Sequence, residues 1–409
     1  MNTNNKLKIF NDPIYGFITI PNTLIFDLIA HRYFQRLRRI SQMGLSYLVY
    51  PGAHHTRFHH ALGCLHLMQK AVRILRFKGV TISEVEENGL YIAILLHDIG
   101  HGPFSHAMEH SIVENSSHEA ISLKFMETLN IEFNGALDTA ILMFKGVYHR
   151  SFFGQLISGQ LDIDRSDYLK RDSFYTGVSE GNINSERLIS MMNVVDDELV
   201  IEEKGIYSIE KFLTARRLMY WQVYLHKTSL VAEQMILRIL KRAKQLTQDG
   251  VMLEASSALR FFLTRNTISK DFDHSTLNQF SLLDDYDIMS ALKSWQFHDD
   301  FVLKQLSEMI LNRALLKIKF KTNPIANSKV ESIKKDLMLK YALEAHEASY
   351  FVFNGHVENL AYNPKKEGFK ILYKNGKTKD ILKASDHLSS KVLSKTVTKH
   401  YICFPKDIL

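Results

Sequence analysis

Apolar residues recur mainly at helical spacing along this chain. From Leu24 to about residue 320 they fall at i, i+3 and i+4 with few interruptions by proline, of which Pro51 and Pro103 are the informative breaks. A pattern of this kind buries one face of each helix against its neighbours. The sequence therefore predicts a mainly α core.

Short β-prone runs stand at the two ends of the chain. Residues 6–20 predict a hairpin, because an Asn-Asp-Pro sequence and Gly16 favour turns between β-forming residues. Residues 369–382 predict a second hairpin around Asn375-Gly376, and residues 400–405 are typical of a further strand. We therefore expect a small α+β region after the helical core.

These patterns divide the chain into three units. They are an N-terminal hairpin and helix at 1–50, a helical core at 51–250, and a C-terminal region at 251–409 that is helical at first and α+β afterwards. The second boundary rests on Gln248-Asp249-Gly250, which is typical of a loop. A length of 409 residues suits one large domain or two ordinary ones.

Composition narrows the class of protein. With 45% hydrophobic and 23% charged residues, the chain is typical of a soluble globular protein. Cys64 and Cys403 are its only cysteines, so there is no disulfide framework and the count fits a reducing cytoplasm. The N-terminus lacks a signal-peptide pattern, and the apolar run Leu90–Leu96 is too short to span a bilayer. We expect a cytoplasmic protein with no membrane partner.

The net charge of +7 is distributed unevenly. Residues 313–409 hold 19 Lys and Arg against 9 Asp and Glu, a balance of +10, whereas residues 1–312 sum to −3. Such a basic region is typical of a solubilising surface, or of a surface for phosphate-bearing partners such as single-stranded nucleic acid.

Histidines cluster at the predicted start of a helix that Thr56 caps. Steps of three and four from His60 meet apolar residues, so His60 points inward, whereas His59 points outward. The apolar run Leu90–Leu96 leads directly into His97-Asp98. A buried carboxylate needs a partner, and a metal ion is the natural one. A hydrogen-bonded core histidine and a polar pair at a helix end remain alternatives.

Carboxylates crowd residues 159–172, where another helix is predicted to begin. If this segment is helical, one face carries Asp164, Tyr168, Arg171 and Asp172. The alternative is a solvated face of salt bridges, although the neighbouring leucines and isoleucine favour partial burial.

His60, His97-Asp98 and Asp164 form, in this order, an H…HD…D set. With the strings around it, the chain resembles HD-domain phosphohydrolases. More narrowly it resembles the deoxynucleoside triphosphate triphosphohydrolases, which include bacterial dGTPases and SAM-and-HD-domain dNTPases. The resemblance covers roughly residues 8–230 and rests on FNDPIYG (10–16), FQRLRRISQMG (34–44), YPGAHHTRFHHALG (50–63), LLHDIGHGPFSHAMEH (95–110), LDIDRSDYLKRD (161–172) and YLHK (224–227).

The resemblance implies an HD-domain helical core that hydrolyses dNTPs, dGTP or several of them, to deoxynucleoside and triphosphate. It implies one divalent cation per active site, Mn, Mg, Fe, Ni or Zn, bound by His60, His97, Asp98 and Asp164. It also implies a homo-oligomer, with a tetramer favoured.

The same resemblance assigns catalytic and substrate positions. His106 and Glu109, three apart on one predicted helical face, match a pair that relays the proton, and the family's site also contains histidines matching His101 and His118. The substrate positions are Arg57 and Arg216 for phosphate, Gln42 and Asp172 for the 3′-hydroxyl, Met43 and Tyr224 beneath C2′, and Tyr168 on the face of Asp164. Bulky groups beneath C2′ would exclude ribonucleotides.

Two departures from the family pattern limit these expectations. Arg165 stands where the family has a phosphate-side lysine, which keeps the charge but changes its geometry. Lys8, Gln35 and Arg38 match parts of a regulatory guanine-nucleotide site, but Ala30 replaces the aspartate that reads the base. Activation by guanine nucleotides is therefore not expected, and a nucleotide effector of other specificity stays open.

Two other functions remain as alternatives. Another HD-type nucleotidase or phosphodiesterase would need the metal set but not the sugar-reading positions. A nucleotide-responsive, single-stranded nucleic-acid-binding protein is suggested by the basic residues 313–409.

Overall fold

α-Helices dominate the computed structural model, which describes residues 8–104, 117–265, 272–359, 368–385 and 396–408. The mainly α class expected from the sequence is confirmed. The α-helices are α1 (Thr23–Ala30), α2 (Arg32–Gln35), α3 (Arg57–Phe77), α4 (Glu84–Leu96), α6 (His118–Glu132), α7 (Asp138–Phe144), α8 (Ser151–Ser158), α9 (Ile163–Thr176), α10 (Ser185–Ser190), α11 (Ile206–Met219), α12 (Lys227–Gln248), α13 (Ser257–Leu263), α14 (His274–Ser281), α15 (Asp285–Trp295), α16 (Phe301–Leu311), α17 (Asn327–Tyr341), α18 (Ala345–Phe351) and α19 (Ile381–Ala384). The strands are β1 (Ile9–Asp12), β2 (Gly16–Thr19), β3 (Met192–Val195), β4 (Glu198–Glu202), β5 (Lys317–Lys321), β6 (Phe353–Asn359), β7 (Lys370–Leu372), β8 (Thr378–Asp380) and β9 (Val397–Phe404).

The helices that form the centre of the molecule begin at capping residues. Thr56 precedes α3, as predicted, and Ser83 precedes α4, where its hydroxyl accepts the backbone N–H of Glu86 at 3.2 Å. The carboxylate of Asp162 accepts the backbone N–H of Arg165 at 2.7 Å and so starts α9. These caps satisfy amide groups that a helix start leaves unpaired, and they fix where each helix begins.

Helices α3, α4 and α9 pack together through apolar faces. Every residue from Leu90 to Leu96 of α4 is at most 4% exposed. His60 of α3 is fully buried and His59 is only half-buried, which confirms the inward and outward directions predicted from helical spacing. The ends of these helices therefore carry polar residues into an apolar core.

The predicted β elements are confirmed. Strands β1 and β2 form an antiparallel hairpin that closes at Asp12 and Gly16, and β7 and β8 flank Asn375-Gly376. Strand β9 is the longer strand expected near residues 400–405, and it pairs on both sides to give the antiparallel order β5-β9-β6.

One hairpin was missed because its segment was assigned to the helical core. Strands β3 and β4 pair antiparallel around Asp196 and Asp197, whose φ angles are 51° and 58°. Aspartate tolerates this left-handed conformation better than most residues, and two such residues in a row suit a tight hairpin turn. An Asp-Asp pair between β-branched runs was the available signal.

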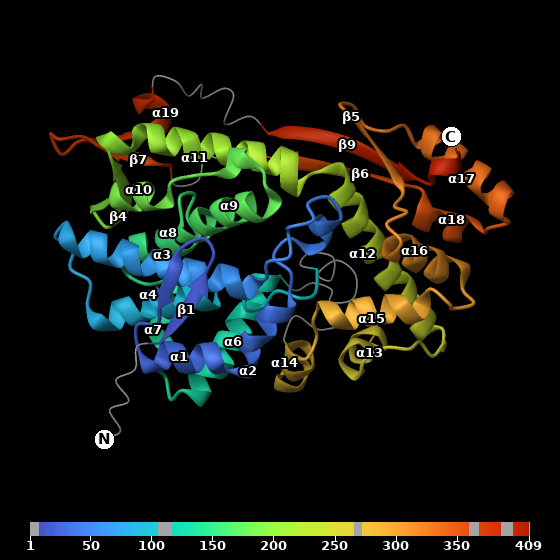
Figure 1. The fold of residues 1–409 in the computed structure, drawn as a ribbon, viewed down its shortest axis with the longest axis horizontal. Helices are drawn as coiled ribbons and strands as arrows, with labels where there is room; N and C mark the ends of the chain where they lie inside the picture. Colours follow the sequence, from blue (N-terminus) through green and yellow to red (C-terminus); the bar gives the residue numbers. More distant parts are fainter. Residues whose placement is uncertain (1–7, 105–116, 266–271, 360–367, 386–395, 409) are drawn as a thin grey trace.

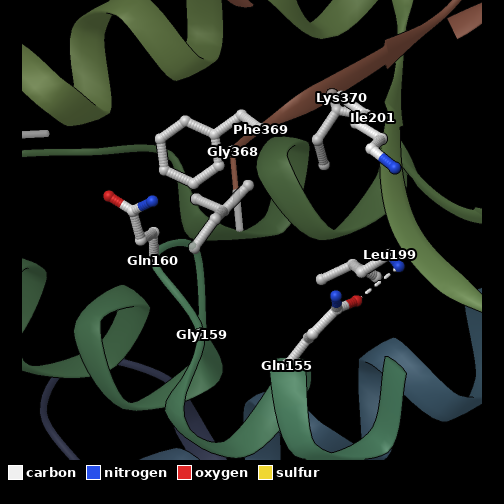
Figure 2. A pocket seen from close by; sticks show the side chains of 9 residues that line it. Gln155, Gly159, Gln160, Leu199, Ile201, Gly368, Phe369 and Lys370 are labelled. Atoms are coloured by element: carbon white, nitrogen blue, oxygen red, sulfur yellow. Dashed lines mark hydrogen bonds between the residues drawn. The ribbon is translucent and has the colours of Figure 1, made fainter. Parts of the chain in front are cut away.

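The C-terminal region returns to the helical core. In Figure 1, β7 and α19 lie beside the green elements, whereas β5, β6, α16, α17 and α18 occupy the opposite end of the molecule. Strand β7 joins the edge of the β3-β4 hairpin by parallel pairing with β4. Figure 2 shows this joint, where Phe369 and Gln160 line a cavity of about 30 Å³. That volume holds a water molecule or two, so the joint is a packed contact. Among the described residues, no helix combines the length and the apolar character needed to cross a bilayer.

The close packing of α3 on α9 depends on Gly63. A Cβ atom at this position would lie 2.1 Å from Asp167 Oδ1 and 2.3 Å from Arg171 Nη2, and both side chains are buried. Gly63→Ala should therefore destabilise the protein by about 1–3 kcal/mol, the usual cost of overpacking, measured as a lower urea midpoint. In Gly154→Ala the nearest atom is 3.7 Å away, so this control should be neutral or more stable by roughly 0.5–1 kcal/mol. Equal midpoints for the two variants would contradict the close approach.

Candidate active site

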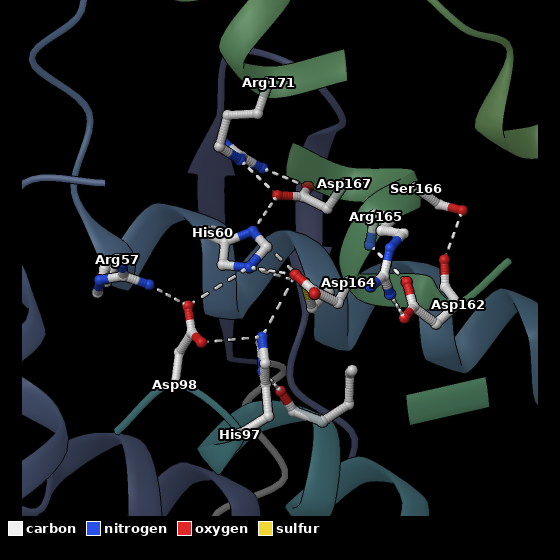
Figure 3. A network of polar contacts seen from close by, with 12 residues as sticks. Arg57, His60, His97, Asp98, Asp162, Asp164, Arg165, Ser166, Asp167 and Arg171 are labelled. Atoms are coloured by element: carbon white, nitrogen blue, oxygen red, sulfur yellow. Dashed lines mark hydrogen bonds and ion pairs between the residues drawn. The ribbon is translucent and has the colours of Figure 1, made fainter. Parts of the chain in front are cut away.

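Two histidines and two aspartates from three helices meet inside the helical core (Figure 3). His60 lies on α3, His97 and Asp98 follow the end of α4, and Asp164 lies in the first turn of α9. Nε2 of His60 is 3.1 Å from Asp164 Oδ1 and 3.8 Å from Asp98 Oδ2. Nε2 of His97 is 3.5 Å from an oxygen of each aspartate. The structure thus groups His60, His97 and Asp164 closely, and Asp98 lies next to both histidines.

A chain of hydrogen-bonded charges orients the ring of His60. Nδ1 of His60 is 2.7 Å from Asp167 Oδ2, and Asp167 accepts from Nε and Nη2 of Arg171 at 2.9 and 3.0 Å. Arg171 also donates to Asp12 Oδ2 of β1 at 2.7 Å. The carboxylate partner assigns the ring proton of His60 to Nδ1, which leaves the Nε2 lone pair facing Asp164. This is the orientation that a metal-binding histidine needs.

His97 presents a buried nitrogen without a hydrogen bond. Its Nδ1 is 2.7 Å from the carbonyl oxygen of Ile94 and donates to it. Its Nε2 is buried and has no hydrogen-bond partner among the described residues. Leaving such an atom unsatisfied costs about 1–3 kcal/mol. The two Nε2 atoms and the carboxylates of Asp98 and Asp164 are a donor set that suits a divalent cation, so the residues present fit a metal centre.

Charge and hydrogen bonding keep both aspartates ionised despite burial. Burial works to raise the pKa of Asp164, but the adjacent rings of His60 and His97 hold that pKa well below its usual range. Burial also opposes ionisation of Asp98, and the charges of His97 and Arg57 hold its pKa well below the usual value. Arg57 forms an ion pair with Asp98 Oδ2. The site therefore offers anionic oxygen ligands at neutral pH.

Cys64 lies one helical turn after His60 but is not oriented as a ligand. Its Sγ is 3.6 Å from Nδ1 and 3.7 Å from Nε2 of His60, so the sulfur lies against the ring and not along the Nε2 lone pair. Burial raises the pKa of the thiol well above its usual value, which keeps it protonated. We interpret Cys64 as a packing neighbour of the metal centre.

Comparisons with known proteins agree with this geometry. A model of the HD domain matches residues 57–172, which contain all four candidate ligands, and a model of an HD associated region matches residues 183–261. The uncharacterized protein YwfO of Bacillus subtilis is 33% identical over 98% of this chain and 93% of its own length. The chain belongs to the HD-domain family.

The chain is also similar to proteins that carry enzyme names. It is 33% identical to the deoxynucleoside triphosphate triphosphohydrolase SAMHD1 homolog of Dictyostelium discoideum over 60% of this chain and 51% of that protein. The chain thus matches about half of that relative's length. The crystal structure of a phosphohydrolase from Bacteroides thetaiotaomicron has a TM-score of 0.95, with 51% identity over 98% of this chain and 100% of that one. These relatives place the chain among HD-type phosphohydrolases.

Two of the four catalytic candidates lie beside the HD centre. Nε2 of His101 is 3.3 Å from Asp98 Oδ1, and its ring stacks on that of His118 with centroids 3.9 Å apart. Burial, together with the charge of Arg57, lowers the pKa of His101 to about 3, so its ring is neutral at physiological pH. The other two candidates, His106 and Glu109, lie outside the described residues.

A second hydrogen-bonded group joins positions predicted to contact the sugar. Asp172 accepts from the Tyr224 hydroxyl at 2.7 Å and lies 2.6 Å from Nε2 of His55. Tyr224 ends a π-helical turn and meets the ring of Tyr168 edge-on, with centroids 5.9 Å apart. The backbone N–H of Gln42 donates to the carbonyl of His55 at 3.0 Å, so the Gln42 segment is tied to the same group.

Two further polar atoms on this side of the site are buried without a hydrogen bond among the described residues. They are Oε1 of Gln42 and Nε of Arg216. Met43, the neighbour of Gln42, packs half-buried against the core. Burial raises the pKa of Tyr168 well above its usual value, while the charge of Arg216 opposes that shift. The candidate phosphate and sugar positions therefore adjoin the first turns of α9.

The remaining residues that the sequence singled out form other contacts or are exposed. Arg165 forms an ion pair with Asp162 and donates to the carbonyl of Gly159 at 2.7 Å, so its guanidinium binds the start of α9. Among the regulatory candidates, Lys8 is exposed. Gln35 donates from Nε2 to the carbonyl of Ile29 at 2.7 Å, and the Arg38 guanidinium lies 3.6 Å from the ring centre of Phe58.

Sequence reasoning missed the residues that support the ligands. Arg171 was grouped with Asp164 from helical spacing, but its guanidinium pairs with Asp167 and Asp12. The available signal was the i, i+4 spacing of Asp167 and Arg171, typical of an ion pair along a helix. His55 was also missed, although it stands in the same histidine-rich string as His60.

Asp167→Asn tests the support of His60. The amide can no longer stabilise the Nδ1 proton as a carboxylate does, so affinity for Mn²⁺ should fall about 10- to 100-fold by titration calorimetry. The control is Asp249→Asn, which changes an exposed carboxylate at the end of α12 and should keep the parent affinity. Circular dichroism would confirm that both variants are folded. A folded Asp167→Asn protein with unchanged Mn²⁺ affinity would refute the role of this residue.

Proposed function

We propose that this chain hydrolyses deoxynucleoside triphosphates to deoxynucleoside and inorganic triphosphate. The observation that carries the proposal is the position of the Asp172–Tyr224–His55 group, whose Asp172 lies on the same helix, α9, as the metal-ligand candidate Asp164. A nucleotide with its phosphates at the HD centre would have its sugar on this side. The name of the SAMHD1 homolog, a deoxynucleoside triphosphate triphosphohydrolase, supports the same substrate class.

The residues divide the chemistry among them. His60, His97, Asp98 and Asp164 would hold one divalent cation, Mn, Mg, Fe, Ni or Zn, which when bound polarises a phosphate oxygen and makes a water more acidic. Arg57 and Arg216 would bind phosphate oxygens through charge-assisted hydrogen bonds.

The reaction forms a bond from a water oxygen to the α-phosphorus and breaks the bond from that phosphorus to the 5′-oxygen. The 5′-oxygen leaves with a proton, for which His106, paired with Glu109, is our sequence-based candidate. His101, neutral and stacked on His118, would donate a hydrogen bond near the reacting phosphate.

An effector site is a second part of the proposal. A cavity of about 210 Å³ next to α10 and α11 is lined by Arg187, Lys204 and Lys211. Tyr207 also lines it and is 70% exposed. Three cationic side chains and an exposed ring suit phosphate groups and a stacked base. A nucleotide effector is therefore proposed here, while tetramer formation and binding of single-stranded nucleic acid stay expectations from the resemblance and from the basic C-terminal region.

Product identification tests the reaction. Incubation with each of the four dNTPs and a divalent cation should release deoxynucleoside and triphosphate, resolved by anion-exchange chromatography. Asp164→Ala should lose bound metal and hydrolysis together, because one anionic ligand disappears from the buried centre. Release of monophosphate or pyrophosphate would contradict the proposal and favour another HD-type nucleotidase or phosphodiesterase. Normal hydrolysis by Asp164→Ala would refute the site.

Selectivity for deoxyribose tests whether the Tyr224 ring lies beneath C2′ of the substrate's sugar. Tyr224→Ala should open room beneath C2′ and lower the preference for dGTP over GTP by about 10-fold or more, compared as kcat/KM ratios. Tyr224→Phe is the matched control, because it keeps the ring and removes only the hydroxyl that Asp172 accepts. Its preference should stay near that of the parent. Equal loss of preference in both variants would show that the hydrogen bond, and not the ring, excludes ribose.

A further inference from the structure

Two segments without regular helix or strand structure flank the candidate site. One runs from Ile40 to Met43 and carries the sugar-side candidates, and the other runs from His97 to Phe104 and carries His101. Phe104 has a φ of 49°, a conformation that a bulky residue holds only when its surroundings impose it. The Phe104 carbonyl oxygen lies 4.0 Å from where a Cβ would sit on Gly44, so the two segments approach each other closely.

A single buried carboxylate bridges these two segments. Asp285, the first residue of α15, is 7% exposed. Its Oδ2 accepts the backbone N–H of Ser41 at 2.8 Å, and its Oδ1 accepts the backbone N–H of Phe104 at 2.9 Å. Burial raises the pKa of Asp285 to about 6, and the two amide hydrogen bonds work against that shift. These two hydrogen bonds therefore stabilise the ionised form of the carboxylate, which burial disfavours.

The residues just before Asp285 also bond to the segments beside the site. The carbonyl of Leu283 accepts from Nη1 of the buried Arg36 at 3.1 Å, and Nη2 of the same guanidinium donates to the carbonyl of Ile99 at 2.7 Å. Asp284 forms an ion pair with Arg39. Three consecutive residues therefore hold the segments beside the HD centre, although they lie outside the residues that the HD and HD-associated models match.

We propose that Asp285 is a positioning residue that fixes the Gln42–Met43 segment relative to the His101 segment and so sets the space for the substrate's sugar. This role rests on the proposed dNTP hydrolysis. Asp285 reaches both segments through backbone amides, those of Ser41 and Phe104. It acts on substrate fit through Gln42 and Met43, which follow the Ser41 amide, and through His101, which precedes the Phe104 amide.

Asp285→Asn removes one of the two acceptors while keeping the size of the side chain. We expect faster hydrogen exchange at the amides of Ser41 and Phe104, and a KM for dNTPs raised about 10-fold with a smaller change in kcat. Asp300→Asn is the control, because Asp300 also lies at a helix start, where it caps α16 and pairs with Arg242. It should lose comparable stability but keep the parent KM and the parent exchange at the two amides.

Asp285→Glu is a second variant, which keeps the test possible if Asp285→Asn fails to fold. It keeps both acceptor oxygens on a longer arm, so exchange and KM should lie between those of the parent and of Asp285→Asn. Parent-like exchange and KM in a folded Asp285→Asn protein would overturn the proposal, as would equal effects in Asp300→Asn. A parent protein that hydrolyses no dNTP would instead contradict the proposed function, and the exchange measurement would still decide whether Asp285 holds the two segments.

Discussion

The buried ion pair between Asp167 and Arg171 is the interaction on which the site depends. Both side chains are fully buried, and a charge in such a place is stable only when it is paired and hydrogen-bonded. Burial works to raise the pKa of Asp167, but Arg171 and His60 lower it to about 2. One guanidinium thus holds α9 to the β1–β2 hairpin through Asp12 and, through Asp167, aims the ring of His60 on α3.

Charged side chains in this apolar core need helices that approach each other closely, as well as partners of opposite charge. Gly63 allows α9 to bring Asp167 and Arg171 against α3, as a Cβ there would overlap both side chains. Gly100 has the same function beside His97-Asp98, since a Cβ there would lie 2.3 Å from the backbone of His118 and of Ser122. The hydroxyl of Ser122 accepts the Gly100 N–H and donates to the His97 carbonyl. Glycines in the motif strings therefore reflect packing around the ligands.

Local sequence patterns were sufficient for features that depend on one helix or one turn. Helical spacing predicted the inward direction of His60, and local residue signals predicted the Thr56 cap and the hairpin around Asn375-Gly376. The convergence of His60, His97-Asp98 and Asp164 needed the family resemblance, because spacing within single helices does not define how helices pack. The bond from Arg171 to Asp12 spans 159 residues of sequence, and no local pattern indicates it. The acidic residues 159–172 also fitted a solvated helix face, because charges of both signs at helical spacing occur on exposed helices as well as at buried sites.

The ligand set and the space around it are controlled by different parts of the chain. The HD model covers the four candidate ligands at residues 57–172, whereas Asp12 precedes that range and Asp285 follows it. Metal ligation constrains the ligands to a narrow set of residue types and distances. Asp285 at the start of α15 accepts from the backbone amides of Ser41 and Phe104, so a shift of that helix would move the segment of Gln42 and Met43, which carries no ligand candidate. Changes at the start of α15 would therefore alter the space beside the HD centre while the set of ligand residues stays the same.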